Sequence, residues 1–267
     1  MAAIRLPDAS SILATFALKA SPAPAPEGAA AAPGPLSFRN YQILRTDEVD
    51  AKDNPLTPEQ RDTMIASGVA ASTRSTGDNF AGTARKAAKL SIPDAPIEPF
   101  ATIAAIVATL PALEQMKEHD PPLGTHADSE RVAEEQRNVS ISAFLYAASR
   151  EGDNDFHLIV GENPNGGGDE VYITMEVSGL PPADAPSSDA IKTVRDAYKA
   201  FFGDKLPGAT YDFYDPPIPM KIEGSLFFDM SHASGNSPGP PTLHPHMPVI
   251  WEVHPISKME FEPDAAS

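Results

Sequence analysis

The chain has no cysteine among its 267 residues, which removes a large part of protein chemistry at once. Disulfide bonds, thiolate nucleophiles and cysteine-ligated zinc are all excluded. An HExxH zinc-protease motif is also absent. Any metal ion would therefore depend on imidazole and carboxylate ligands, a set that suits zinc or manganese.

Long hydrophobic runs are lacking as well. The most apolar stretch, residues 101–113, is too short to cross a bilayer and contains Pro111. Residues 10–23 (SSILATFALKASPA) weakly resemble a signal peptide, but Lys19 interrupts their apolar part. The sequence predicts no membrane span and favours a cytoplasmic location over a secreted one.

Basic side chains are scarce, most of all in the second half. The formal net charge is −17, and residues 131–267 carry 21 of the 37 acidic side chains but only 9 of the 20 basic ones. Affinity for nucleic acid comes largely from Lys and Arg that displace counterions from phosphates. The charge therefore favours a protein or carbohydrate partner over nucleic acid.

Proline, by contrast, is abundant, with 29 residues gathered in connecting segments. Residues 1–36 include SPAPAPEGAAAAPGPL and predict a flexible arm or linker, which could join copies of the chain as a homo-oligomer. Residues 37–130 predict a partly helical region. It includes a short helix at 57–68 and an apolar stripe of helical period from Phe100 to Met116, with Pro111 as its break. A tail covers 263–267.

From residue 131 to 262 the pattern changes to strands. Alternating apolar residues predict strands at 138–151, 155–162 and 171–178. A capped amphipathic helix at 187–203 follows, and then strands at 220–230 and 249–261. Gly224 allows a bend or bulge within the fourth strand. The order is three strands, one helix and two strands.

That order resembles the OB-fold, a five-stranded Greek-key barrel that staphylococcal-nuclease-like domains share. The resemblance implies a mainly β domain with one helix (βββ-α-ββ), and a ligand site on its second and third strands and nearby loops. An SH3-like barrel or a small open sandwich remains an alternative. Three blocks, DNDFHLIV, GSLFFDMSH and WEVHPISKMEF, also resemble bacterial proteins with D-x-D-x-H-L and E-(L/I)-H-P-V strands, most of them without an assigned activity.

Several acidic and histidine residues lie at the ends of these strands. Strand parity puts Asp155 and His157 on one face of the second predicted strand. In a barrel, this pair and the groups at the end of the fourth strand would lie near the loops at the barrel mouth. The sequence thus predicts a divalent metal site drawn from the set Asp155, His157, Asp229, His232 and His254. The competing interpretation is that these residues are structural.

Parity on the last strand favours the structural interpretation for one pair. Val249, Trp251 and Val253 share one side, and Glu252 and His254 share the other. The apolar side is the better candidate for the core. Glu252 and His254 would then form a buried polar pair wherever another element covers them.

The function that these patterns favour is a non-catalytic binding or assembly module. The alternative is a metal-dependent hydrolase, similar to a phosphodiesterase, with its site at the mouth of the barrel. A nuclease of the staphylococcal type is disfavoured, because it needs arginines that stabilise a phosphate, and Arg150 and Arg195 lie in no such context.

Overall fold

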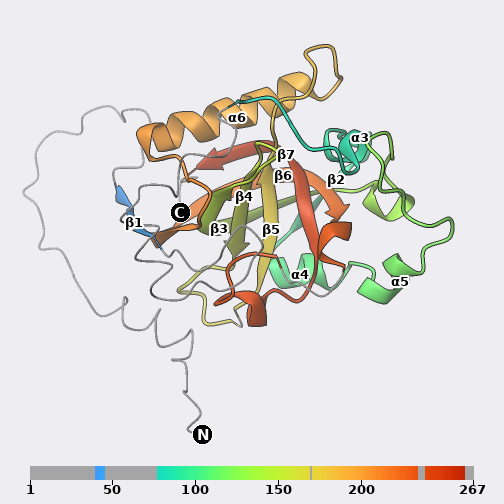
Figure 1. Ribbon diagram of the computed structural model, residues 1–267. Helices are drawn as coiled ribbons and strands as arrows, with labels where there is room; N and C mark the ends of the chain where they lie inside the picture. The colour runs from blue at the N-terminus through green and yellow to red at the C-terminus, as the bar shows by residue number, and fades with distance from the viewer. Residues whose placement is uncertain (1–39, 46–76, 169, 234–237, 262–267) are drawn as a thin grey trace, which may run out of the picture. The chain divides into compact units, whose positions relative to one another are not determined.

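Seven strands form one sheet in the computed structural model, which describes residues 40–45, 77–168, 170–233 and 238–261 (Figure 1). In hydrogen-bonded order they are β1, β6, β7, β5, β4, β3 and β2. Their bounds are β1 Gln42–Arg45, β2 Ile97–Phe100, β3 Asn138–Arg150, β4 Phe156–Gly161, β5 Tyr172–Val177, β6 Asp212–Phe228 and β7 Trp251–Phe261. The fold is mixed α/β and richer in strand than in helix.

The strand pairings form a closed cycle. β3 pairs with β4 on one side and with β6 on the other, both antiparallel. β4 pairs with β5, β5 pairs in parallel with β7, and β7 pairs with β6. The five strands expected from the sequence are therefore present in the expected order, with a helix between β5 and β6.

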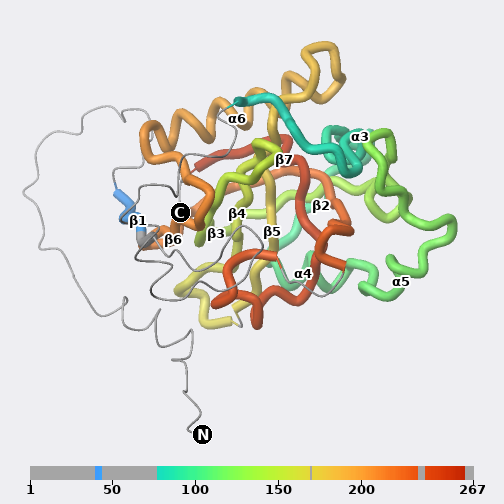
Figure 2. The backbone as a smooth tube through the Cα atoms, viewed as in Figure 1, coloured from blue at the N-terminus to red at the C-terminus, as the bar shows by residue number. Residues whose placement is uncertain are grey.

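That helix, α6 (Ser188–Phe202), covers one end of the main core. Figures 1 and 2 show it crossing the strands at one end, with α4 (Ile103–Val107) near the other. Its apolar stripe supplies Val194, Tyr198 and Phe201 to the core, and Gly203 ends it at φ 57°, which glycine adopts without strain. The predicted helix is confirmed.

The central strands are buried on both faces, since every residue of β4 and β5 is buried. Leu158 and Met175 point into the main core. Ile159 and Tyr172 point the other way, into a smaller cluster with Leu243 from the loop after β6. Because both faces of these strands are covered, polar side chains that point away from the main core can be buried as well.

The predicted helical stripe from Phe100 to Met116 is wrong as a single helix. Phe100 ends β2, which pairs in parallel with β3, and two short helices follow, α4 and α5 (Leu113–Lys117). Pro111 lies in the break between them, and its carbonyl accepts a hydrogen bond from Trp251 Nε1 at 3.0 Å. The stripe nevertheless serves packing, because Ile103, Ile106 and Met116 are buried in the main core.

Strand β6 begins eight residues earlier than the sequence suggests. The stretch Asp212–Asp215 lies before the strand predicted at 220–230, and it pairs with β1. Pro216 and Pro217 lie where β6 is paired with neither β1 nor β3. Their missing N–H groups therefore interrupt no ladder hydrogen bond.

The region before residue 131 contributes to the same sheet. β1 and β2 both come from it, and so does α3 (Lys86–Lys89). The predicted arm at 1–36, the helix at 57–68 and the tail at 263–267 lie outside the described residues. In the part of the chain that the structure describes, none of the helices is long and apolar enough to span a membrane.

Gly224 lies at the register shift between β6 and β7, where the sequence predicted a bulge. A Cβ there would contact the Val253 side chain and lie 2.8 Å from the Pro255 carbonyl oxygen. We expect Gly224→Ala to lower the free energy of unfolding by about 1–3 kcal/mol, since backbone has to move. Chemical denaturation checks this against Gly208→Ala, whose Cβ would meet no atom within 4 Å. Equal stability of the two variants would contradict it.

Candidate functional site

The pairing register gathers ionisable side chains on the outer face of β4, β5 and β7, opposite the main core. His157 and Glu176 are direct cross-strand partners, and so are Thr174 and Glu252. Direct partners share a face, with side chains close enough to interact. His254 and Glu176 each lie two residues beyond the Thr174–Glu252 pair, on the same face.

His254 lies at the centre of three carboxylates. Its Nδ1 is 3.1 Å from Glu176 Oε2 and 3.2 Å from Glu252 Oε1, and its Nε2 is 3.5 Å from Asp155 Oδ2. Asp155 and His254 have no solvent exposure, and Glu176 and Glu252 are buried. We call Asp155, Glu176, Glu252 and His254 the His254 cluster.

Asp155 is held by the chain just after β5. Its Oδ1 accepts hydrogen bonds from the Gly179 backbone N–H and the Ser178 hydroxyl. A Cβ at position 179 would lie 2.8 Å from the backbone nitrogen of Phe80, so only glycine fits this close approach. Oδ1 is thus fixed, and Oδ2 turns toward His254.

Three atoms of the cluster have no hydrogen-bond partner among the described residues. They are Asp155 Oδ2, Glu176 Oε2 and His254 Nε2, all buried, and their contacts within the cluster are the ion-pair distances given above. Native proteins pair nearly all buried polar atoms, because an unpaired one costs the desolvation of that group. Asp155, Glu176 and His254 could each offer one ligand atom to a metal, with all of these atoms within 4.8 Å of one another.

Residues 77–92 lie beside the cluster, where the Ala81 backbone N–H donates to the Asp153 carbonyl at 2.8 Å. Phe80 and Leu90 pack against Ile191 of α6, and Asn79 forms a parallel bridge with Leu180. We call residues 77–92 the cover segment. The polar face that the sequence predicted to need a cover therefore has one.

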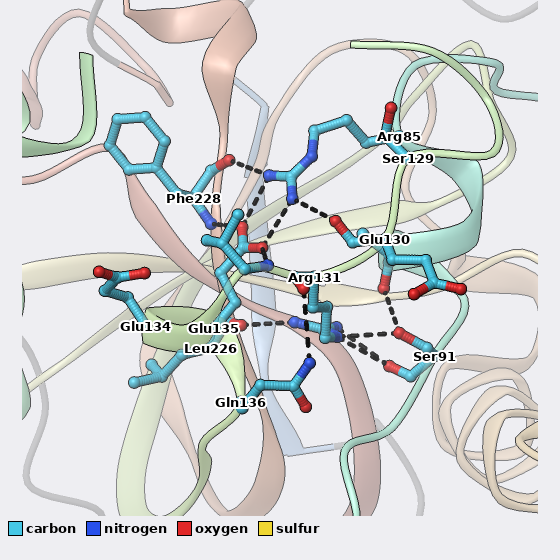
Figure 3. Close-up of polar contacts among 12 residues, drawn as sticks. Arg85, Ser91, Ser129, Glu130, Arg131, Glu134, Glu135, Gln136, Leu226 and Phe228 are labelled. Atoms are coloured by element: carbon cyan, nitrogen blue, oxygen red, sulfur yellow. Dashed lines mark hydrogen bonds and ion pairs between the residues drawn. The ribbon is translucent and has the colours of Figure 1, made fainter. Parts of the chain in front are cut away.

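Arg85 fastens the cover segment to β6 (Figure 3). Its guanidinium makes two hydrogen bonds to the Glu135 carboxylate, at 2.7 and 2.6 Å, and one to the Phe228 carbonyl at 3.2 Å. Glu135 also accepts from the backbone N–H groups of Phe228 and Val132, both at 2.9 Å. Every hydrogen bond to this buried carboxylate is charge-assisted, which makes the connection a strong one.

Arg131 makes the second connection. Its guanidinium donates to the carbonyls of Leu226 and His254, each at 2.5 Å, and its Nε donates to Ser91 Oγ at 3.0 Å. Leu226 lies on β6, His254 on β7 and Ser91 in the cover segment. One side chain thus joins the cover to the backbone of the histidine at the centre of the cluster.

Lys89, at the end of α3, lies beside the cluster at the rim of a polar pocket. Its side chain is 13 % exposed, and its ammonium is 3.8 Å from Asp153 Oδ2. The pocket, about 270 Å³, is lined by Lys89, His157, Glu176, Tyr211, Asp229 and His232 among others. A larger pocket of about 760 Å³, formed by residues 86–94 and 181–187, is mostly apolar and contains none of the cluster residues.

Burial and mutual repulsion give the carboxyl groups of the cluster very different pKa values. Burial and the neighbouring Glu176 raise the pKa of Asp155 well above its ordinary value. The same two causes raise the pKa of Glu252 to about 8. Burial would also raise the pKa of Glu176, but the charges of Lys89 and His254 outweigh it and hold that pKa well below its ordinary value. Glu176 is therefore the ionised member.

The two cations respond to the same carboxylates. Burial lowers the pKa of His254, but Glu176 outweighs this effect and raises it to about 10. Burial likewise lowers the pKa of Lys89, while Glu176 and Glu252 raise it well above its ordinary value. The site attracts cations and makes three carboxylates compete for them.

The five residues predicted as metal ligands fall into two groups. Asp155 and His254 meet in the cluster, and His157 lies beside Glu176 on the adjacent strand. Asp229 and His232 form their own pair, 3.5 Å apart, in the lining of the pocket. The two remaining C-terminal histidines, His244 and His246, contact Gly239 and Glu170 instead.

Glu176 and Glu252 are the residues that the sequence prediction left out of the metal set. Glu252 was interpreted as the buried partner of His254, and the 3.2 Å contact between the two confirms this pairing. Glu176 was not among the predicted ligands, and the register that pairs it with His157 could have indicated its role.

No protein-family model, no curated protein and no solved structure matches the chain. Its activity is therefore inferred from the geometry of this face.

Proposed function

We propose that the chain binds a divalent metal ion at the His254 cluster, with Asp155, Glu176 and His254 as ligands. One observation carries the proposal: three buried side chains, from the residue before β4, from β5 and from β7, can each offer a ligand atom within 4.8 Å of the others, and each has one buried atom without a hydrogen-bond partner among the described residues. A metal ion would satisfy all three at once. Mixed oxygen and imidazole ligation favours zinc or manganese over calcium or magnesium.

The competing explanation is a structural ion-pair network with His254 as its cation. Such a network keeps buried charges only when their remaining lone pairs are also satisfied. The carboxylate of Glu135 meets this condition, because each of its oxygens accepts two hydrogen bonds, and in that network only Arg85 Nε lacks a partner among the described residues. The His254 cluster lies in the same molecule and does not meet it, which favours the metal.

An OB-like barrel is the architecture that fits this proposal best. The cyclic pairing of β3, β4, β5, β7 and β6 supports it, as does the helix between β5 and β6. In such barrels the second and third strands form the ligand face. In this chain those strands are β4 and β5, which carry His157 and Glu176.

Metal titration of the purified full chain tests the proposal. We expect wild-type protein freed of metal by a chelator to bind Zn²⁺ or Mn²⁺ in calorimetry, and His254→Gln to lose more than about 100-fold in affinity, beyond what loss of an outer contact costs. His246→Gln is the matched control, since His246 contacts Glu170 outside the cluster. Absence of binding by the wild type, or equal binding by both variants, would overturn the proposal.

For the wider role, a non-catalytic module with a protein or carbohydrate partner remains our first proposal. A metal-dependent hydrolase is the second candidate, and the polar pocket beside Glu176 favours it. Catalytic metal sites leave a coordination position open to solvent, whereas structural ones are closed. Hydrolysis of an activated phosphodiester by metal-loaded wild type, absent in His254→Gln, would support the enzyme; equal rates would remove it.

A further inference from the structure

The three proposed ligands Asp155, Glu176 and His254 form a first set, which shares Glu176 with a second set of potential ligands. His157, Glu176 and Glu252 can also each offer one atom to a metal, again with all atoms within 4.8 Å. Glu176 belongs to both sets, and its Oε2 is buried without a hydrogen-bond partner among the described residues. A carboxylate has two oxygens, so one side chain can serve two adjacent cations.

The two positions differ in their access to solvent. Asp155 and His254, which belong only to the first set, have no exposure. His157, which belongs only to the second set, lines the polar pocket together with Glu176. A cation held by His157, Glu176 and Glu252 would therefore lie on the pocket side of the cluster.

The ring of His157 is already oriented in the way that metal-bound histidines are. Its Nδ1 is 2.6 Å from the hydroxyl of Tyr211, which leaves Nε2 as the nitrogen for a ligand. Ligand histidines usually have their second ring nitrogen fixed by a hydrogen-bond partner, which sets the tautomer and orients the ring. Tyr211 is a positioning residue of this kind.

We propose that the pocket holds a second divalent cation, bound by His157, Glu176 and Glu252, and bridged through Glu176 to the cation of the His254 cluster. This inference rests on the proposed function. The second cation is open to the pocket, so it completes its coordination with water or with an oxygen of a small ligand. Paired ions of this kind lie about 3.5–4 Å apart in two-metal sites.

The electrostatics of the pocket suit a cation at this position. Asp229 and Asp153 also line the pocket, and Asp153 lies beside Lys89. Lys89 is the one described lysine or arginine that lines the pocket, and several carboxylates compete for it. A second divalent ion would neutralise this excess of acidic groups.

Manganese titration followed by electron paramagnetic resonance distinguishes the two positions. We expect wild-type protein to bind two equivalents of Mn²⁺ with an exchange-coupled signal. His157→Gln and Asp155→Asn should each bind one equivalent with an uncoupled signal, and Glu176→Gln should bind none. Glu252→Gln gives a second way to remove the pocket position if His157→Gln does not fold, as judged by circular dichroism.

Each failure has a distinct signature. A wild type that binds one equivalent, retained in both His157→Gln and Glu252→Gln, would overturn the second position and leave the proposed function intact. A wild type that binds no metal would overturn both. Two equivalents that persist in His157→Gln and in Glu252→Gln would place the second ion elsewhere and also overturn this inference.

Discussion

Replacing Glu135 by glutamine is expected to lower the free energy of unfolding by about 3–5 kcal/mol, the usual cost of breaking a buried ion pair from one side. The carboxylate now accepts hydrogen bonds from Arg85 and from the backbone N–H groups of Phe228 and Val132. The NH₂ group of a glutamine amide would face some of these donors with another donor. Arg85 would keep its charge in a buried place without a counterion. Chemical denaturation monitored by circular dichroism measures the loss.

Glu134→Gln is the matched control, one residue away. The Glu134 side chain is 35 % exposed and contacts His119 at 3.3 Å, so its loss should cost less than about 1 kcal/mol. If both variants lose the same small amount, Arg85 does not fasten the cover segment as the geometry implies. Because that segment carries Lys89, the Glu135 variant should also expose the His254 cluster to faster amide exchange.

The strands were predictable because their signal is local. A period of two residues assigns Val139, Ile141 and Leu145 to one face without knowledge of any partner strand. The same parity put Glu252 and His254 together, opposite Trp251, and the structure confirms their pairing. The helix between the third and fourth strands was predictable for the same reason.

Other features depend on contacts between residues far apart in the chain. Arg85 and Glu135 are separated by 50 residues, and Lys89, which lies beside the cluster, comes from the region before residue 131. Glu176 needed the register of β4 and β5 to be recognised as the neighbour of His157. The start of β6 depended on β1, a strand of four residues with no signal of its own.

Carboxylates gathered in a buried metal site should destabilise the folded protein when no metal is bound. The Glu252→Gln variant tests this. Burial and the neighbouring Glu176 raise the pKa of the Glu252 carboxyl to about 8, from an ordinary 4.5. We expect the metal-free variant to be more stable than the metal-free wild type, by about 1 kcal/mol or more at about pH 8. A structural salt bridge would give the opposite sign.

The pH dependence follows from the direction of this shift. Between about pH 4.5 and pH 8 the folded state holds a proton on Glu252 that the unfolded state has lost, so wild-type stability falls as pH rises through this window. Glutamine cannot ionise, so the advantage of the variant should grow from about pH 5 to about pH 8 and then level off. Added Mn²⁺ should reverse the order, because only the wild type gains the full binding energy. A variant that is less stable without metal at every pH would show that Glu252 serves the fold as a charged partner of His254, and the case for a metal at its carboxylate would fail.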